Sequence, residues 1–175
     1  MRTLRSATLT LEPLQESHAD AMFEVLSSPE MYAYMPGKPP QSVAALRERY
    51  RALETRRSAD GAQQWLNWIV RLQSGACTGF VQATVHPRRT ADFAFAFAPQ
   101  HWGRGVAFEA STTAIACLFE DFEVAALYCT IDPANRRSLR LVERLAFQDI
   151  PPREYPHGTP EPNDRVFRRM RAPLR

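Results

Sequence analysis

One segment constrains the fold of this chain more than any other: residues 100–107, Gln-His-Trp-Gly-Arg-Gly-Val-Ala. Residues 91–98 precede it, and their large and small apolar side chains alternate up to Pro99, which predicts a strand. Downstream, small and apolar residues recur at helical spacing from Val106 to Leu118, which predicts a helix. The middle of the chain is therefore expected to run as strand, glycine-containing turn and helix.

A glycine turn that opens a helix has a chemical use. The first N–H groups of a helix have no partner within it and carry the positive end of the helix dipole, so they attract anions. Gly103 and Gly105 lack a Cβ atom, which lets the main chain turn sharply and approach a phosphate. The segment thus predicts a pyrophosphate site. Neither the dinucleotide fingerprint nor the Walker pattern occurs in the sequence, which excludes those two classes.

Composition sets further limits. With 175 residues the chain is expected to form a single domain, residues 1–175. A net charge of +3 and a pI near 9.0 are too mild to indicate nucleic-acid binding, but they suit an anionic cofactor. No apolar run approaches the ~20 residues of a membrane span. The three cysteines and four histidines lack the spacing of metal or triad motifs, so we expect a reduced, cytoplasmic protein without a metal.

Gln-x-x-Gly-x-Gly between a strand and a helix resembles the acetyl-CoA signature of the GNAT N-acetyltransferases. A second segment, residues 132–147, is similar to that family's Asn-x-x-Ser/Ala segment, which ends in Gly-Phe; here Ala146 stands before Phe147. Residues 91–95 and the Pro-x-x-Trp-Gly-x-Gly pattern of residues 99–105 further resemble the RimJ/RimL-like branch. Two ordered motifs at the expected separation carry the resemblance.

The resemblance implies a mixed α/β fold of the GNAT type, with about seven mostly antiparallel strands, a splayed parallel pair and about four helices. The sequence pattern independently predicts part of this arrangement. Residues 65–72, 77–85 and 91–98 are strand-like with short connections, which predicts an antiparallel meander. The strand at 125–131 follows a helix, so the crossover should place it parallel to the strand at 91–98.

The resemblance also implies acetyl-CoA as the cosubstrate and direct attack by a primary amine in a ternary complex. Asp92 matches the position of a Glu proposed as general base; alternatively it orients the ammonium or is an ordinary strand-edge carboxylate. Val142 occupies the position where many relatives carry a Tyr general acid. Ser138 is therefore the candidate donor to the thiolate, unless it only bonds the main chain early in a helix.

The cofactor is expected to contact the end of the central strand, the glycine turn and the following helix starts. Main-chain N–H groups at the strand's end are expected to stabilise the oxyanion. Asn135 can serve the cofactor, cap a helix, or do both. The expected cofactor-binding residues are Phe97, Ala98, Gln100, Gly103, Arg104, Gly105, Val106, Ala107, Asn135 and Arg140.

Two proline-rich segments are expected to border the acceptor pocket by analogy with the family. Residues 28–41 would form one wall, unless their tyrosines merely cover the edge of the core. Residues 151–164 would close over the acceptor, unless they form a passive surface loop. Tyr32, Tyr34 and Tyr155 are the expected substrate contacts. The acceptor is a protein N-terminus or a small-molecule amine, and the protein a monomer or homodimer. Membrane and direct nucleic-acid partners are not expected. The competing hypothesis is a CoA-binding module that has lost catalysis.

Overall fold

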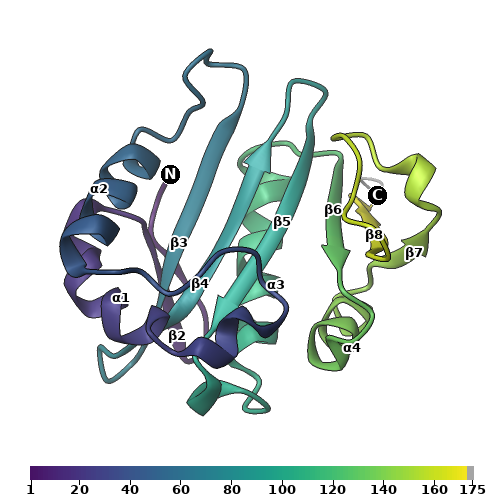
Figure 1. Cartoon of the computed structure of the whole chain (residues 1–175). Coiled ribbons are helices and arrows are strands. Elements are labelled where there is room, and N and C mark those ends of the chain that lie inside the picture. The colour runs from purple at the N-terminus through teal and green to yellow at the C-terminus, as the bar shows by residue number, and fades with distance from the viewer. Residues whose placement is uncertain (173–175) are drawn as a thin grey trace.

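The computed structural model describes residues 1–172, which form one eight-stranded sheet with helices on both faces (Figure 1). The strands lie in the order β1-β2-β3-β4-β5-β6-β8-β7. The strand bounds are β1 Leu4–Arg5, β2 Leu9–Pro13, β3 Gln64–Leu72, β4 Cys77–Val85, β5 Thr90–Phe97, β6 Ala126–Ile131, β7 Gln148–Ile150 and β8 Arg165–Met170. The α-helices are α1 Ala19–Leu26, α2 Val43–Glu54, α3 Val106–Glu120 and α4 Arg136–Arg144.

The alternation in β5 separates two hydrophobic layers. Ala91, Phe93 and Phe97 are buried on the face covered by α3 and α4. Ala96 points to the opposite face, where the residues of α1 and α2 pack. Ala94 lies on the same face as Ala96 and is exposed, although it is in the middle of a central strand. The sheet is therefore covered only partly on the α1 and α2 side.

The pairing of β5 with its two neighbours differs. β4 and β5 pair antiparallel along their whole length, from Val85/Ala91 to Gly79/Phe97. β5 and β6 are the parallel pair that the crossover predicted, but they pair only from Thr90/Ala126 to Asp92/Tyr128. Beyond this point the two strands diverge, as Figure 1 shows. The predicted splay is thus confirmed, and the sheet has eight strands where about seven were expected.

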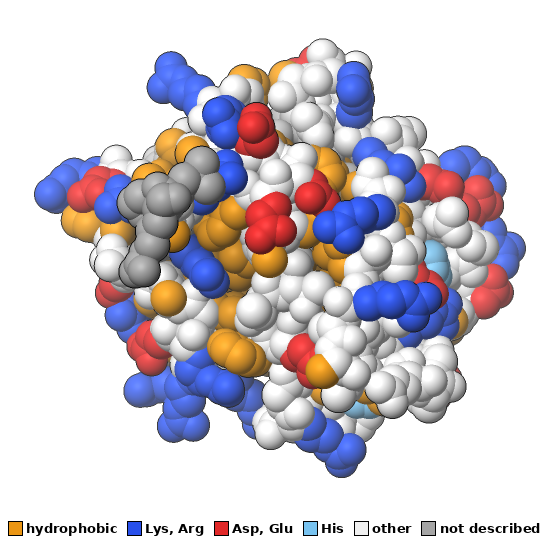
Figure 2. All heavy atoms as spheres, turned by 180° about the vertical axis from the view of Figure 1, so that it is seen from behind, with side chains coloured by type: hydrophobic (Ala, Val, Ile, Leu, Met, Phe, Trp, Pro, Cys, Tyr) orange, Lys and Arg blue, Asp and Glu red, His pale blue; other side chains and the backbone are white. Residues whose placement is uncertain are grey.

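Charges of both signs share the face behind the sheet. Figure 2 shows blue arginine and lysine side chains interspersed with red carboxylates and orange apolar patches over this face. No single-sign surface gathers there, in keeping with the modest net charge of +3. In the described part of the chain, no helix combines the length and hydrophobicity needed to cross a bilayer.

Glu109 joins the first turn of α3 to the chain between β1 and β2. Its carboxylate accepts hydrogen bonds from the Ser6 hydroxyl (2.7 Å), the Thr8 hydroxyl (2.7 Å) and the Thr8 N–H (2.8 Å). Partial burial acts to raise the pKa of Glu109, but these donors outweigh it and hold the pKa below its usual value. A carboxyl group with a depressed pKa stabilises the fold above its unfolded-state pKa and loses this contribution as the pH falls.

Replacing Glu109 by glutamine is expected to lower the free energy of unfolding by about 1–2 kcal/mol at pH 7, because the amide cannot accept all three hydrogen bonds. The difference from wild type should shrink as the pH falls through the folded-state pKa of Glu109. Urea unfolding at pH 7 and pH 3 measures it, with Glu120→Gln at the exposed end of α3 as the control. An equal difference at both pH values would contradict the proposed linkage.

Candidate active site

The edge of β5 that faces β6 is identified by hydrogen bonds at the two ends of the strand. The carbonyl of Thr90 accepts from the N–H of His86 (2.8 Å), and the N–H of Ala98 donates to the carbonyl of Thr78 (2.9 Å). Main-chain polar groups alternate in direction along an antiparallel strand. The even-numbered residues of β5 therefore direct these groups toward β4, and the odd-numbered residues direct theirs toward β6.

Phe95 and Phe97 are the odd-numbered residues beyond the last β5–β6 pair, Asp92/Tyr128. Their N–H groups face the opening between the diverging strands. The oxyanion donors were expected around Phe97 and Ala98, but the N–H of Ala98 donates to β4 on the other side. The correction follows from the two-residue alternation of a strand, which pairs Phe97 with Phe95 and not with its neighbour.

At the end of β5 the chain forms the predicted glycine turn and enters α3. Gly105 precedes the helix in the left-handed conformation, with φ of 81°. Gly103 has a φ of 71°, and a Cβ atom on either glycine would meet open space. Arg104 and Gln100 are exposed beside the turn, whereas Val106 is buried and Ala107 half-buried at the start of α3. The helix start is thus open to an anion from outside.

Trp102 joins the two sides of the opening, a role that sequence analysis missed. Its indole N–H donates to the carbonyl of Phe97 (2.7 Å), and the guanidinium of Arg137 lies 4.4 Å from the ring centroid. His101 precedes Trp102 in the sequence. Partial burial, and then the charge of Arg104, lower the pKa of His101, and its imidazole is therefore neutral at pH 7. The contact between Trp102 and Arg137 joins residues 35 positions apart, so no local sequence pattern could predict it.

The start of α4 forms the opposite side. The Asn135 side chain accepts a hydrogen bond from the N–H of Ser138 (3.1 Å), so Asn135 caps the helix as one of the two interpretations predicted. Ser138 is half-buried and Arg140 is exposed. Val142 is fully buried in the core, which gives this position a packing role.

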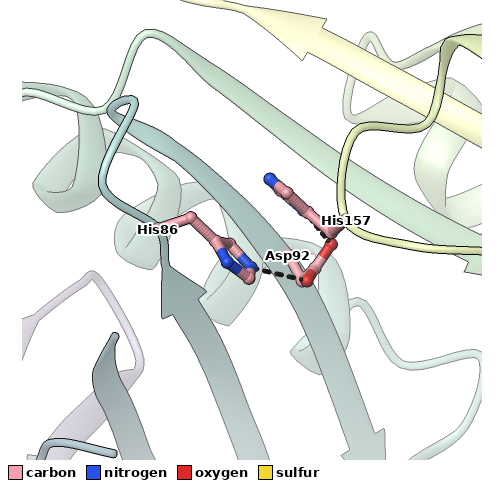
Figure 3. A group of neighbouring side chains, drawn as sticks. All are labelled: His86, Asp92 and His157. Carbon is pink, nitrogen blue, oxygen red and sulfur yellow. Dashed lines mark hydrogen bonds and ion pairs between the residues drawn. The ribbon is translucent and has the colours of Figure 1, made fainter. Parts of the chain in front are cut away.

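Asp92 lies at the other end of β5, where His86 and His157 contact its carboxylate (Figure 3) and Tyr155 donates to it. His86 Nε2 lies 2.9 Å from Oδ2, while the Tyr155 hydroxyl and His157 Nδ1 lie 2.8 Å and 2.7 Å from Oδ1. Burial first, and then the hydrogen bond to Asp92, raise the pKa of Tyr155, so the phenol stays protonated and donates. The spacing of the four histidines in the sequence gave no sign of a partner, yet His86 and His157 both contact Asp92.

Comparison with known proteins decides the family. The profile described as "Acetyltransferase (GNAT) domain" matches residues 8–148. The chain belongs to the GNAT acetyltransferase family. A relative, the uncharacterized N-acetyltransferase p20 of Bacillus licheniformis, is 28% identical over 151 residues, which cover 85% of this chain and 83% of the relative.

Two solved structures share the GNAT fold with this enzyme. Mycobacterium smegmatis RimJ, in complex with CoA-disulfide, superimposes with a TM-score of 0.78 at 16% identity, covering 96% of this chain and 85% of the other. Spermidine N-acetyltransferase from Vibrio cholerae, in complex with CoA and spermine, gives a TM-score of 0.73 at 20% identity, covering 93% and 94% of the two chains. The two structures show the GNAT fold of the chain, and the family match shows that it is an acyltransferase.

The two predicted acceptor loops of this GNAT enzyme hold their tyrosines differently. Tyr155 reaches Asp92, and the loop around it lines a hollow of about 560 Å³. The hydroxyl of Tyr32 donates to the carbonyl of Leu26 at the end of α1 (3.1 Å), and burial raises the pKa of Tyr32. Tyr34 is 48% exposed. Tyr32 thus covers the edge of the core, as the alternative interpretation held, and Tyr155 belongs to the Asp92 cluster.

His86, Asp92 and His157 also have the residue types of a metal site, and their ligand atoms lie within 4.8 Å of one another. Their geometry favours hydrogen bonding. The two imidazole rings are stacked, with centroids 3.7 Å apart and an angle of 20° between the planes. A nitrogen lone pair lies in the plane of its ring, so an ion shared between stacked rings would lie outside both planes. His86 Nε2 and His157 Nδ1 instead point to different oxygens of the Asp92 carboxylate.

Proposed function

We propose that this GNAT acetyltransferase moves the acetyl group of acetyl-CoA to a primary amine by direct attack in a ternary complex. The observation that carries the proposal is the opening between β5 and β6. The strands pair only as far as Asp92/Tyr128, and the N–H groups of Phe95 and Phe97 face the space beyond. Such N–H groups can pair with an extended ligand as a strand would, and can stabilise a thioester oxyanion.

The cofactor would lie with its pyrophosphate at the start of α3 and its thioester tail between the diverging strands. Gly103 and Gly105 leave the first N–H groups of α3 open to the phosphates. Arg104, exposed in this turn, is placed to pair with a phosphate, and Arg140 on α4 is a weaker candidate. Gln100, Val106 and Ala107 complete this contact surface, with Asn135 holding the facing helix.

The acceptor would approach from the face on which Asp92 and the exposed Ala94 lie. Holding the amine beside the thioester supplies much of the acceleration. Deprotonating an α-amine with a pKa near ~8 costs about 1 kcal/mol at pH 7, and a lysine ε-amine near ~10.4 costs about 4–5 kcal/mol. The similarity to spermidine N-acetyltransferase supports a small amine as one acceptor class, and a protein N-terminus is the other.

The departure of the CoA thiolate requires little help from the protein. A thiol has an ordinary pKa of about 8.5, so a CoA thiolate can depart with modest help. Ser138, half-buried in the first turn of α4, is the candidate donor to the sulfur because Val142 lies in the core. The three cysteines are free thiols, which suits a reducing cytoplasm.

A second candidate function is a CoA-binding module without turnover. The buried Val142 and the three hydrogen bonds to the Asp92 carboxylate favour it. Calorimetry with acetyl-CoA, followed by release of free CoA in the presence of peptide α-amines and polyamines, separates the two. Binding with turnover on either amine class supports the transferase. Binding without turnover on any acceptor supports the module, and no binding rejects both.

A further inference from the structure

We propose that the imidazole of His86 accepts the proton that the attacking amine loses, and that Asp92 and His157 position this imidazole. This assignment rests on the proposed function and changes the role of Asp92 within it. The base is expected at Asp92 from the sequence, but the hydrogen bonds around the carboxylate direct the proton to the ring beside it.

Asp92 has little capacity left as a proton acceptor. A carboxylate offers about four acceptor positions, and three of those on Asp92 are filled. The Asp92 side chain is 34% exposed, but both of its oxygens already accept hydrogen bonds. The Tyr155 hydroxyl, which burial keeps protonated, is one of these donors. The carboxylate therefore resembles the aspartate of a catalytic triad, which orients an imidazole and stays ionised.

The carboxylate fixes the tautomers of the two imidazoles. An ionised carboxylate accepts only, so His86 Nε2 and His157 Nδ1 both carry a hydrogen. In a neutral ring the other nitrogen is then the acceptor. His157 Nε2 lies 2.8 Å from the Thr90 hydroxyl and is satisfied by it. Among residues 1–172, His86 Nδ1 has only the Gln63 amide as a partner, at 3.5 Å. Of the two acceptor nitrogens, His86 Nδ1 and His157 Nε2, His86 Nδ1 therefore has the weaker hydrogen-bond partner.

Stacking limits the cluster to one added proton. The ring centroids of His86 and His157 lie 3.7 Å apart, so two imidazolium charges would repel strongly. The titratable groups that face His86 are Asp92, His157 and, through the carboxylate, Tyr155. The His157 side chain is 6% exposed and that of His86 is 16% exposed. The added proton therefore goes to His86, where Asp92 balances its charge.

The reaction step balances with this assignment. The neutral amine nitrogen forms a bond to the thioester carbonyl carbon, and its excess proton passes to His86 Nδ1, directly or through one water. The carbon–sulfur bond then breaks and its electron pair leaves on the CoA sulfur. The imidazolium returns its proton to the thiolate through solvent or Ser138. The products are an amide and CoA thiol, with His86 neutral again.

Kinetics of four variants test the assignment. His86→Gln is expected to lower kcat about 100-fold at pH 7 and to remove the acidic limb of the kcat profile, with KM for acetyl-CoA unchanged. Asp92→Asn, whose amide no longer fixes the Nε2–H tautomer of His86, should lower kcat similarly. His157→Gln should cost about tenfold and keep the limb, since His86 retains its lone pair. Arg88→Gln, exposed in the same turn, is the control and should match wild type.

Nitrogen-15 NMR of the histidine side chains supplies a readout that does not depend on turnover. His86 is expected as the Nε2–H tautomer in wild type and as a mixture in Asp92→Asn. Two results would overturn this role of His86. One is the Nδ1–H tautomer of His86 in wild type, and the other is a His86→Gln variant within twofold of wild-type kcat with its acidic limb intact. Neither result would contradict the proposed acetyl transfer. Absence of turnover in wild type overturns both.

Discussion

Replacing Gly79 by alanine is expected to lower the free energy of unfolding by about 3 kcal/mol, near the upper end for overpacking. A Cβ atom at this position in β4 would lie 2.1 Å from the carbonyl oxygen of Ala96 and 2.7 Å from Cα of Phe97. Both are main-chain atoms of β5, so neither can move aside as a flexible side chain could. β4 and β5 would have to separate at the end of β5 that borders the cofactor opening.

Urea unfolding measures this loss, and Gly75→Ala is the matched control. Gly75 lies in the turn before β4 with φ of 86°, and a Cβ atom there would meet nothing within 4 Å. Its substitution carries only the cost of a left-handed conformation, about 1 kcal/mol. Gly79→Ala should also weaken acetyl-CoA binding because the edge of Phe97 shifts. Equal losses in the two variants would show that the close approach of β4 and β5 is unimportant.

Gly105→Val is expected to weaken acetyl-CoA binding by at least about tenfold, which corresponds to about 1.4 kcal/mol. Gly105 has φ of 81° immediately before α3, and a β-branched residue is strongly disfavoured there. The chain would relieve the strain by turning the first N–H groups of α3 away from their present direction. Those groups form the proposed pyrophosphate site, so affinity should fall by more than the fold loses in stability.

Calorimetry of acetyl-CoA binding provides the measurement for Gly105→Val. Gly61→Val is its control, since Gly61 has a similar φ of 71° and open space around it, in the loop between α2 and β3. That variant should lose stability to a similar extent and keep its affinity for acetyl-CoA. If both variants bound acetyl-CoA as well as wild type, the glycine turn would not be the phosphate site.

The sequence predicted the parts of the fold that depend on local pattern. The strand–turn–helix at residues 91–119 and the parallel crossover are confirmed, because large–small alternation and a glycine helix start are local signals. The strands β1 and β7 were not predicted. They hold two and three residues, too few for an alternating pattern to appear, and they form only through pairing with β2 and β8.

The glycine turn of the candidate site was predicted from the sequence, whereas the grouping of two histidines and Tyr155 around Asp92 was not. Gly103 and Gly105 are close in the sequence, so the motif alone placed them before α3. Asp92 and His157 are 65 residues apart, and the loop that carries His157 has no periodic pattern to place it. Only the turn between β4 and β5 and the return of the chain after β7 bring the two histidines to one carboxylate.

The divergence of β5 from β6 gives this protein a sheet edge in its interior. An unpaired strand edge is an aggregation hazard that proteins usually cover with a helix, a charge or a bulge. In the proposed complex the N–H groups of Phe95 and Phe97 would pair with the cosubstrate, so the ligand-free protein must leave them open. If the cosubstrate binds there in place of a strand, its binding would also protect this edge from self-association.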